Sequence, residues 1–192
     1  MWVAMMAAMM LPATYPMVRA FVTINRRRRE RAAPYVPTAW FVLGYLLAWS
    51  VFSIAAAAVQ WGLQHAGLLN AMGESLSRTL SGILFLAAGA YQWTPLKDVC
   101  LSRCRSPEGF VLTEWRDGHA GAVVMGLRHG LFCVGCCGAL MLLLFAVAVM
   151  NLLWVAVLTL LVMAEKLLPP GRAVRHAIGG MLSAIGLWLL LS

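Results

Sequence analysis

Three cysteines lie within five positions of the sequence, at Cys133, Cys136 and Cys137, and His129 precedes them by four residues. On an α-helix, residues three or four apart occupy neighbouring positions of one face, so this spacing gathers three thiols and an imidazole. Thiolates are soft ligands that select Cu(I), zinc or iron–sulfur chemistry. We therefore predict a metal site with these cysteines as its core ligands and His129 as an addition, holding Cu(I) or, alternatively, zinc.

A second pair of thiols, Cys100 and Cys104, is four residues apart and shares a face if its segment is helical. The flanking residues Arg103 and Arg105 favour the thiolate form, which both binds metals and attacks disulfides. We expect this pair to add ligands to the metal site. The alternative is a pair of inert, reduced thiols.

Four of the methionines before Pro12 form two pairs, with Met5 one helical turn from Met9 and Met6 one turn from Met10. Thioethers bind Cu(I) and few other biologically abundant metals. Methionine also fills gaps between helices without any ligand role. We expect these four side chains either to pack in a core or to form a relay site for Cu(I) near the outer side of a membrane.

The elements that position these side chains are too apolar for a soluble domain. Of 192 residues, 62% are hydrophobic and 11% charged, whereas a soluble domain is roughly half apolar and a quarter charged. A membrane-crossing helix needs about 20 apolar residues. We predict an all-α, polytopic membrane helix bundle, a single integral membrane domain over residues 1–192. About six transmembrane helices are expected, at 1–24, 35–63, 78–93, 121–150, 152–167 and 174–190.

The first of these spans contains Pro12 and Pro16, which predict a kink or a break near its middle. At the inner end of the fifth span, Glu165 and Lys166 are expected to extend toward the membrane surface. The chain starts directly in an apolar run with no basic segment before it, so we expect no removable signal peptide.

The formal net charge of +8 follows the predicted loops rather than a nucleic-acid-binding motif, so no nucleic-acid partner is expected. The loops at 25–34, 94–120 and 166–175 hold five, four and three Lys or Arg residues, whereas the loop at 64–79 holds one. Because cytoplasmic loops carry the excess of basic residues, we predict that both termini lie on the outer side of the membrane.

Four motifs, in matching order, resemble a bacterial integral membrane family classed as a domain of unknown function and as predicted metal-binding. They are Met5-Met6-Ala7-Ala8-Met9-Met10-Leu11-Pro12, Tyr91-Gln92-Trp93-Thr94-Pro95-Leu96-Lys97 with Cys100 and Cys104, Gly135-Cys136-Cys137, and Met150-Asn151-Leu152 leading to Glu165-Lys166. This chain has Gly138 where members usually carry an aromatic residue. The resemblance implies a membrane fold, metal binding, and a further helix before the methionine motif in a longer form. It implies no particular metal, activity or substrate.

We therefore predict a membrane protein that handles a soft metal, Cu(I) before zinc, by transport or by delivery. Its partner would be a metallochaperone or a membrane metalloenzyme, and small residues in the last span permit an oligomer. Two alternatives stay open. One is a membrane thiol–disulfide oxidoreductase, with Cys133/Cys136 or Cys100/Cys104 as its redox pair. The other is a structural or assembly subunit whose cysteines only pack.

Overall fold

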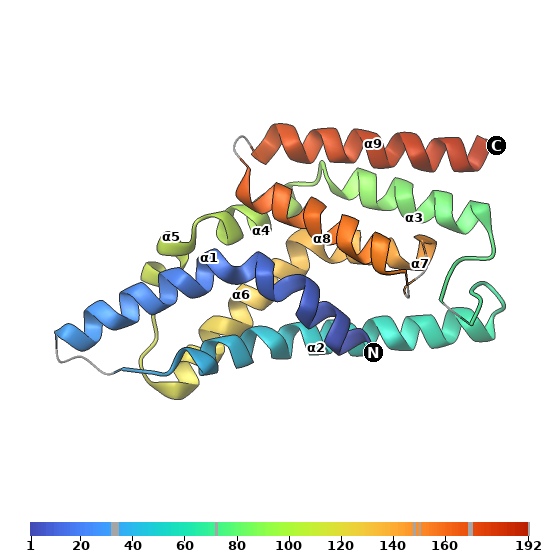
Figure 1. Ribbon diagram of the computed structural model, residues 1–192. Coiled ribbons are helices and arrows are strands. Elements are labelled where there is room, and N and C mark those ends of the chain that lie inside the picture. Colours follow the sequence, from blue (N-terminus) through green and yellow to red (C-terminus); the bar gives the residue numbers. More distant parts are fainter. Residues whose placement is uncertain (32–34, 72, 148, 150, 169–170, 192) are drawn as a thin grey trace. The chain divides into compact units, whose positions relative to one another are not determined.

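The structure, a computed structural model, describes residues 1–31, 35–71, 73–147, 149, 151–168 and 171–191. Over these residues the chain is helical, and the only β pairing is an isolated bridge between Leu69 and Ser75. The prediction of an all-α fold is confirmed (Figure 1). The helices are α1 (Trp2–Glu30), α2 (Thr38–His65), α3 (Arg78–Tyr91), α4 (Pro95–Arg105), α5 (Pro107–Thr113), α6 (Gly118–Met141), α7 (Leu144–Val147), α8 (Leu152–Leu167) and α9 (Gly171–Leu191).

Four stretches among the described residues are long and apolar enough to cross a membrane, where the sequence predicts six spans. They are α1, α2, the α6–α7 stretch and α9 from Arg172 onward. Helices α3 and α8 have 14 and 16 residues, so they reach about 21 and 24 Å, less than the roughly 30 Å of bilayer hydrocarbon. The expected number of six is thereby corrected to four helices of membrane-crossing length.

Helix α1 corrects one further expectation at its C-terminal end and agrees with the expected kink in its middle (Figure 1). The predicted loop at 25–34 begins inside the helix, because α1 continues to Glu30. Arginine is a good helix former, and positive charge near the C-terminal end of a helix is favourable. Pro12 and Pro16 lie inside one continuous helix, which bends but does not break (Figure 1).

The polar segment predicted as a loop at 94–120 contains two helices, α4 and α5. Pro95 is the first residue of α4 and Pro107 the first of α5. Proline is favoured at this position because its fixed φ suits a helix and its missing N–H would be unpaired there anyway. The span predicted at 121–150 is also divided, since α6 ends at Met141 and a turn precedes α7.

The chain forms two compact units, Met1–Ser53 with Val99–Gly135, and Ile54–Asp98 with Cys136–Ser192. The core of the first unit holds Met17, Phe21, Val36, Phe41, Phe110, Val111, Ala122 and Met125. In this unit α2 and α6 approach closely through glycines. A Cβ atom at Gly44 would lie 2.0 Å from the Val123 carbonyl oxygen, and one at Gly126 would lie 1.9 Å from that of Phe41. Only glycine fits there.

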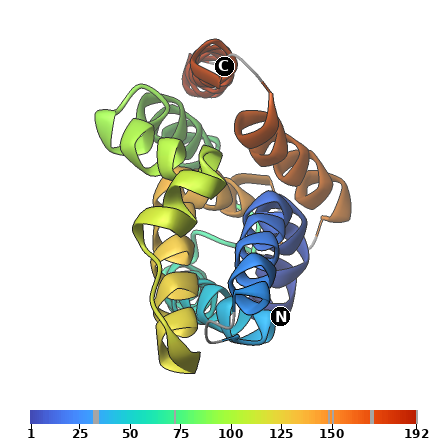
Figure 2. The ribbon, with the colours of Figure 1, turned by 90° about the vertical axis from the view of Figure 1, so that its left-hand side faces the viewer.

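In the second unit α3 and α9 pack side by side along their lengths (Figure 1), and Figure 2 views α9 end-on. A Cβ atom at Gly89 would lie 2.4 Å from Ser183 Oγ, and one at Gly186 would lie 2.8 Å from the Leu86 nitrogen. Of the small residues of α9, Gly179, Ser183 and Gly186 therefore pack against α3 of the same chain, in the close approach that small side chains allow. Gly180 faces open space, with no atom within 4 Å of an added Cβ.

Candidate metal centre

The thiols of Cys133, Cys136 and Cys137 gather on helix α6, with every pair of sulfur atoms within 4.8 Å. The Sγ atoms of Cys136 and Cys137 are 3.7 Å apart. All three side chains are buried, with 0%, 1% and 1% exposure. Three sulfur ligands that each lie about 2.3 Å from a zinc ion are about 3.8–4.0 Å from one another in tetrahedral or trigonal geometry. The Cys136–Cys137 distance of 3.7 Å fits this spacing, and a pair at the 4.8 Å limit would have to close by about 1 Å to share one ion of that size.

Tyr45 on α2 links this cluster to the methionine helix. Its hydroxyl donates a hydrogen bond to the Met10 carbonyl oxygen at 3.1 Å, and the same oxygen lies 3.2 Å from Cys133 Sγ. The side chain is fully buried. A hydrogen-bonding group beside a ligand sulfur orients that ligand and tunes its metal affinity. The sequence gives no spacing signal for this residue, which looks like one aromatic among many in an apolar span.

His129 lies one helical turn before Cys133 on α6 and is buried among aromatic rings. Its ring centroid is 5.6 Å from that of Tyr45, 5.5 Å from that of Phe110 and 6.2 Å from that of Phe41. Its Nε2 atom is 3.1 Å from Thr14 Oγ1 on α1. Among the described residues, the group of close ligand atoms contains the three thiols and not His129. A ligand role for this histidine stays a prediction.

Cys100 on α4 lies directly against α6. A Cβ atom at Gly135 would come within 2.7 Å of Cys100 Sγ, so this thiol occupies the space that the glycine leaves open. Gly135 stands between Cys133 and Cys136 in the sequence. The structure therefore brings a thiol from the second predicted pair to the helix that carries the cluster. Its partner Cys104 follows one turn later on α4 and is half-buried.

The methionines of the first motif are unequal in their exposure. Met6, Met9 and Met10 are buried, with 0%, 2% and 0% exposure, whereas Met5 is partly exposed. The buried three belong to one face of α1, since Met9 and Met10 follow Met6 by three and four residues. Through Met10, whose carbonyl accepts the Tyr45 hydrogen bond, this face reaches the surroundings of Cys133.

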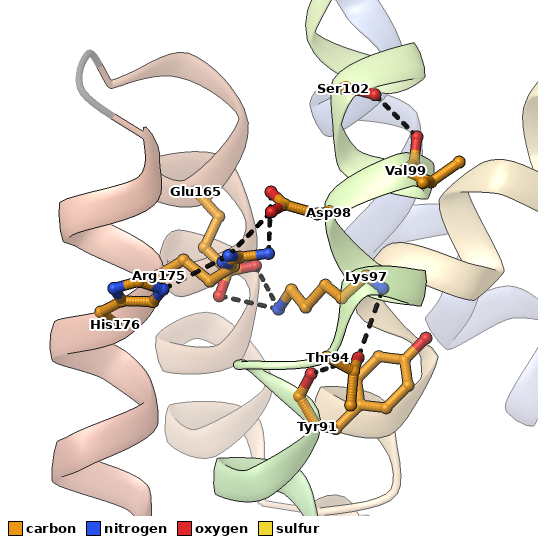
Figure 3. A network of polar contacts seen from close by, with 9 residues as sticks. All are labelled: Tyr91, Thr94, Lys97, Asp98, Val99, Ser102, Glu165, Arg175 and His176. Atoms are coloured by element: carbon orange, nitrogen blue, oxygen red, sulfur yellow. Dashed lines mark hydrogen bonds and ion pairs between the residues drawn. The ribbon is translucent and has the colours of Figure 1, made fainter.

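A network of buried charges in the second unit was not foreseen. The Lys97 ammonium lies 2.8 and 2.9 Å from the two Glu165 carboxylate oxygens, and these side chains are 0% and 2% exposed (Figure 3). Beside them Arg175 pairs with Asp98 at 2.9 Å. Glu165 and Lys166, expected to reach the membrane surface, are instead 1% and 8% exposed. Glu165 is buried because Lys97 supplies the opposite charge that burial requires.

Comparison with known proteins assigns the chain to a family. No curated protein and no solved structure matches it. The family model described as "PpoB2: Copper chaperone" matches residues 1–189, which is nearly the whole chain. The cysteine cluster and this match together support the metal-binding part of the resemblance found in the sequence. The chain belongs to the PpoB2 copper chaperone family.

Proposed function

We propose that the protein is an integral membrane copper chaperone that holds Cu(I) on the thiols of Cys133, Cys136 and Cys137 and passes it to another protein. The observation that carries the proposal is the buried cluster of three sulfur atoms within 4.8 Å of one another. Soft thiolates favour Cu(I) among the common metals, and the family description names copper. Copper is cargo here, so the ion must leave the site again; zinc is the alternative cargo.

The other predicted ligands extend this site in the proposal. Cys100 is the strongest addition, because its sulfur packs against α6 at Gly135. Cys104 and His129 would serve as further ligands during transfer. Met5, Met6, Met9 and Met10 would form a relay on α1, supported by the burial of three of them and by the Met10–Tyr45 hydrogen bond.

Membrane embedding is the second part of the proposal, supported by the four helices of membrane-crossing length. We propose a single integral membrane domain in a bacterial inner membrane. Placing the arginine-rich end of α1 on the cytoplasmic side follows the positive-inside rule. The receiving partner would be a membrane metalloenzyme, or a metallochaperone that also binds Cu(I) through soft ligands.

The test is the metal content of the detergent-purified protein, measured by elemental mass spectrometry after anaerobic loading with Cu(I) or zinc. Wild type should hold about one copper ion per chain, and C133S/C136S/C137S should lose it while keeping its helical circular dichroism. Cys104→Ser is the single-thiol control and should keep the stoichiometry. A metal-free wild type would overturn the proposal, and reversible thiol oxidation in that sample would favour the oxidoreductase alternative.

A further inference from the structure

A groove of about 550 Å³ lies between α1 and α5 in the first unit. Its α1 wall is formed by residues at successive four-residue steps, which therefore share one helix face. These residues are Tyr15, Arg19, Thr23 and Arg27. The facing wall on α5 includes Glu108 and Leu112. The groove thus combines two cationic side chains, one anionic side chain and apolar surface.

The charges of this groove are available for a ligand, unlike the other arginines of α1. Arg26 pairs with Glu30 at 3.2 Å, and Arg28 pairs with Asp117 at 2.6 Å. The guanidinium of Arg29 lies 5.2 Å from the centre of the Tyr35 ring. Within the described ranges, no ion pair engages the side chains that line the groove, Arg19, Arg27 and Glu108.

The apolar part of the groove is open to its surroundings. Tyr15 and Leu112 are 63% and 67% exposed, and Pro16, Ala20 and Ile24 line the groove beside them. Large exposed apolar side chains beside unpaired charges fit a ligand with a charged head and an apolar tail. In a membrane that ligand is a phospholipid, whose headgroups meet helices at their charged ends.

We propose that this groove binds a phospholipid with a primary-amine headgroup, of the phosphatidylethanolamine type. The phosphate would lie between Arg19 and Arg27, because guanidinium groups form paired hydrogen bonds with phosphate oxygens. The ammonium group would meet Glu108, and an acyl chain would lie along Tyr15 and Leu112. This inference rests on the membrane embedding in the proposed function, but not on its copper site.

Charge complementarity separates this lipid from two others. Phosphatidylglycerol has the phosphate but no ammonium group, so it has no positive charge to pair with the Glu108 carboxylate. Phosphatidylcholine has a quaternary ammonium without N–H donors, so it cannot hydrogen-bond to that carboxylate. Since exposed ion pairs contribute modestly, we expect a preference for phosphatidylethanolamine of about twofold to fivefold.

The test is native mass spectrometry of the copper-loaded, full-length chain in detergent with equal amounts of the three phospholipids. Wild type should retain phosphatidylethanolamine above the other two. Glu108→Gln should remove its advantage over phosphatidylglycerol, because only the ammonium contact is lost. R19Q/R27Q should reduce the retention of all three phospholipids, because the phosphate that they share loses its guanidinium partners. Inorganic phosphate at millimolar concentration should not displace the lipid.

The matched control is R26Q/E30Q, which removes charges from the same end of α1 but outside the groove walls. Equal lipid retention in the control and in R19Q/R27Q would overturn the inference, as would displacement by free phosphate or a wild-type preference for phosphatidylglycerol. Copper content is measured in the same samples. If the protein retains copper but shows no lipid preference, only the lipid site is contradicted. If it retains the lipid preference but holds no copper, only the copper site is contradicted.

Discussion

At the scale of single residues, the surroundings of Cys133 matter as much as the cysteines themselves. The Tyr45 hydroxyl lies between a backbone carbonyl of α1 and a sulfur of α6, and it is shielded from water. Such a contact restricts the rotamers of the cysteine, and since the tyrosine donates its proton to the Met10 carbonyl, its oxygen is left to accept from the Cys133 thiol. The residue is therefore a positioning residue for the candidate metal centre rather than a ligand.

We expect Tyr45→Phe to weaken Cu(I) binding by about tenfold, because groups that orient metal ligands commonly contribute ten- to hundredfold to affinity. Affinity is measured by equilibrium competition with a Cu(I) chelator, approached from both the loaded and the empty protein. Tyr35→Phe is the control, since that ring is 50% exposed and lies beside Arg29. Equal affinities for the two variants would argue against a role for Tyr45.

A second prediction concerns the contact between Gly135 and Cys100. Gly135→Ala places a methyl group 2.7 Å from Cys100 Sγ, and overpacking of this kind costs about 1–3 kcal/mol of folding free energy. Adding Cys100→Ala removes the sulfur and should restore most of the melting temperature. Gly180→Ala, which meets no atom within 4 Å, is the control and should change it little. If the melting temperature of the double variant did not recover, the contact between Gly135 and Cys100 would not be the cause of the destabilisation.

At the scale of helices, periodicity and composition were enough to predict an all-α chain and the shared face of the three thiols. The end of α1 was not predictable by equating charge with loops, because arginine also continues a helix well. The pair of Lys97 and Glu165 was missed for another reason. Its members are 68 residues apart, and no local pattern connects a cation in a polar segment with a carboxylate at the end of an apolar one.

Breaking the buried ion pair between Lys97 and Glu165 should destabilise the protein. We expect Lys97→Met to lower the free energy of unfolding by about 3–5 kcal/mol, because it leaves Glu165 as a buried charge without its cation. K97M/E165Q should recover part of the loss. Arg26→Met, which breaks an exposed pair with Glu30, should cost no more than about 1 kcal/mol. The measurement is denaturant unfolding in detergent micelles, and equal losses for Lys97→Met and Arg26→Met would contradict a buried pair.

At the scale of the whole molecule, the number of times the chain crosses the membrane decides whether its two termini lie on the same side. If the four helices of membrane-crossing length among the described residues all cross, as proposed, the number of crossings is even, and it stays even if α3 and α8 also cross. The prediction that both termini share the outer side is thus independent of how these two shorter helices lie. Sequence alone did not separate the two cases, since hydropathy marks an apolar run without fixing where its helix ends.

This orientation predicts that alkaline phosphatase fused after α9 is active in a bacterial host, because that enzyme requires an oxidising, extracytoplasmic compartment. A green fluorescent protein fusion at the same point should be dark when exported in unfolded form. A fusion after Arg31, at the arginine-rich end of α1, is the control and should give the reverse pattern. Phosphatase activity only at the α1 fusion would invert the proposed topology.

The burial of the three thiols would determine how a copper ion bound there, as proposed, leaves them. With 0–1% of each side chain exposed, bulk water does not reach the sulfur atoms to replace a departing ligand. The ion would then move only by ligand exchange, in which a donor atom of the receiving protein binds the ion before the last cysteine sulfur dissociates from it. Dilution alone should therefore not release copper from the loaded protein. The residence time of the ion should shorten as the concentration of the receiving protein rises.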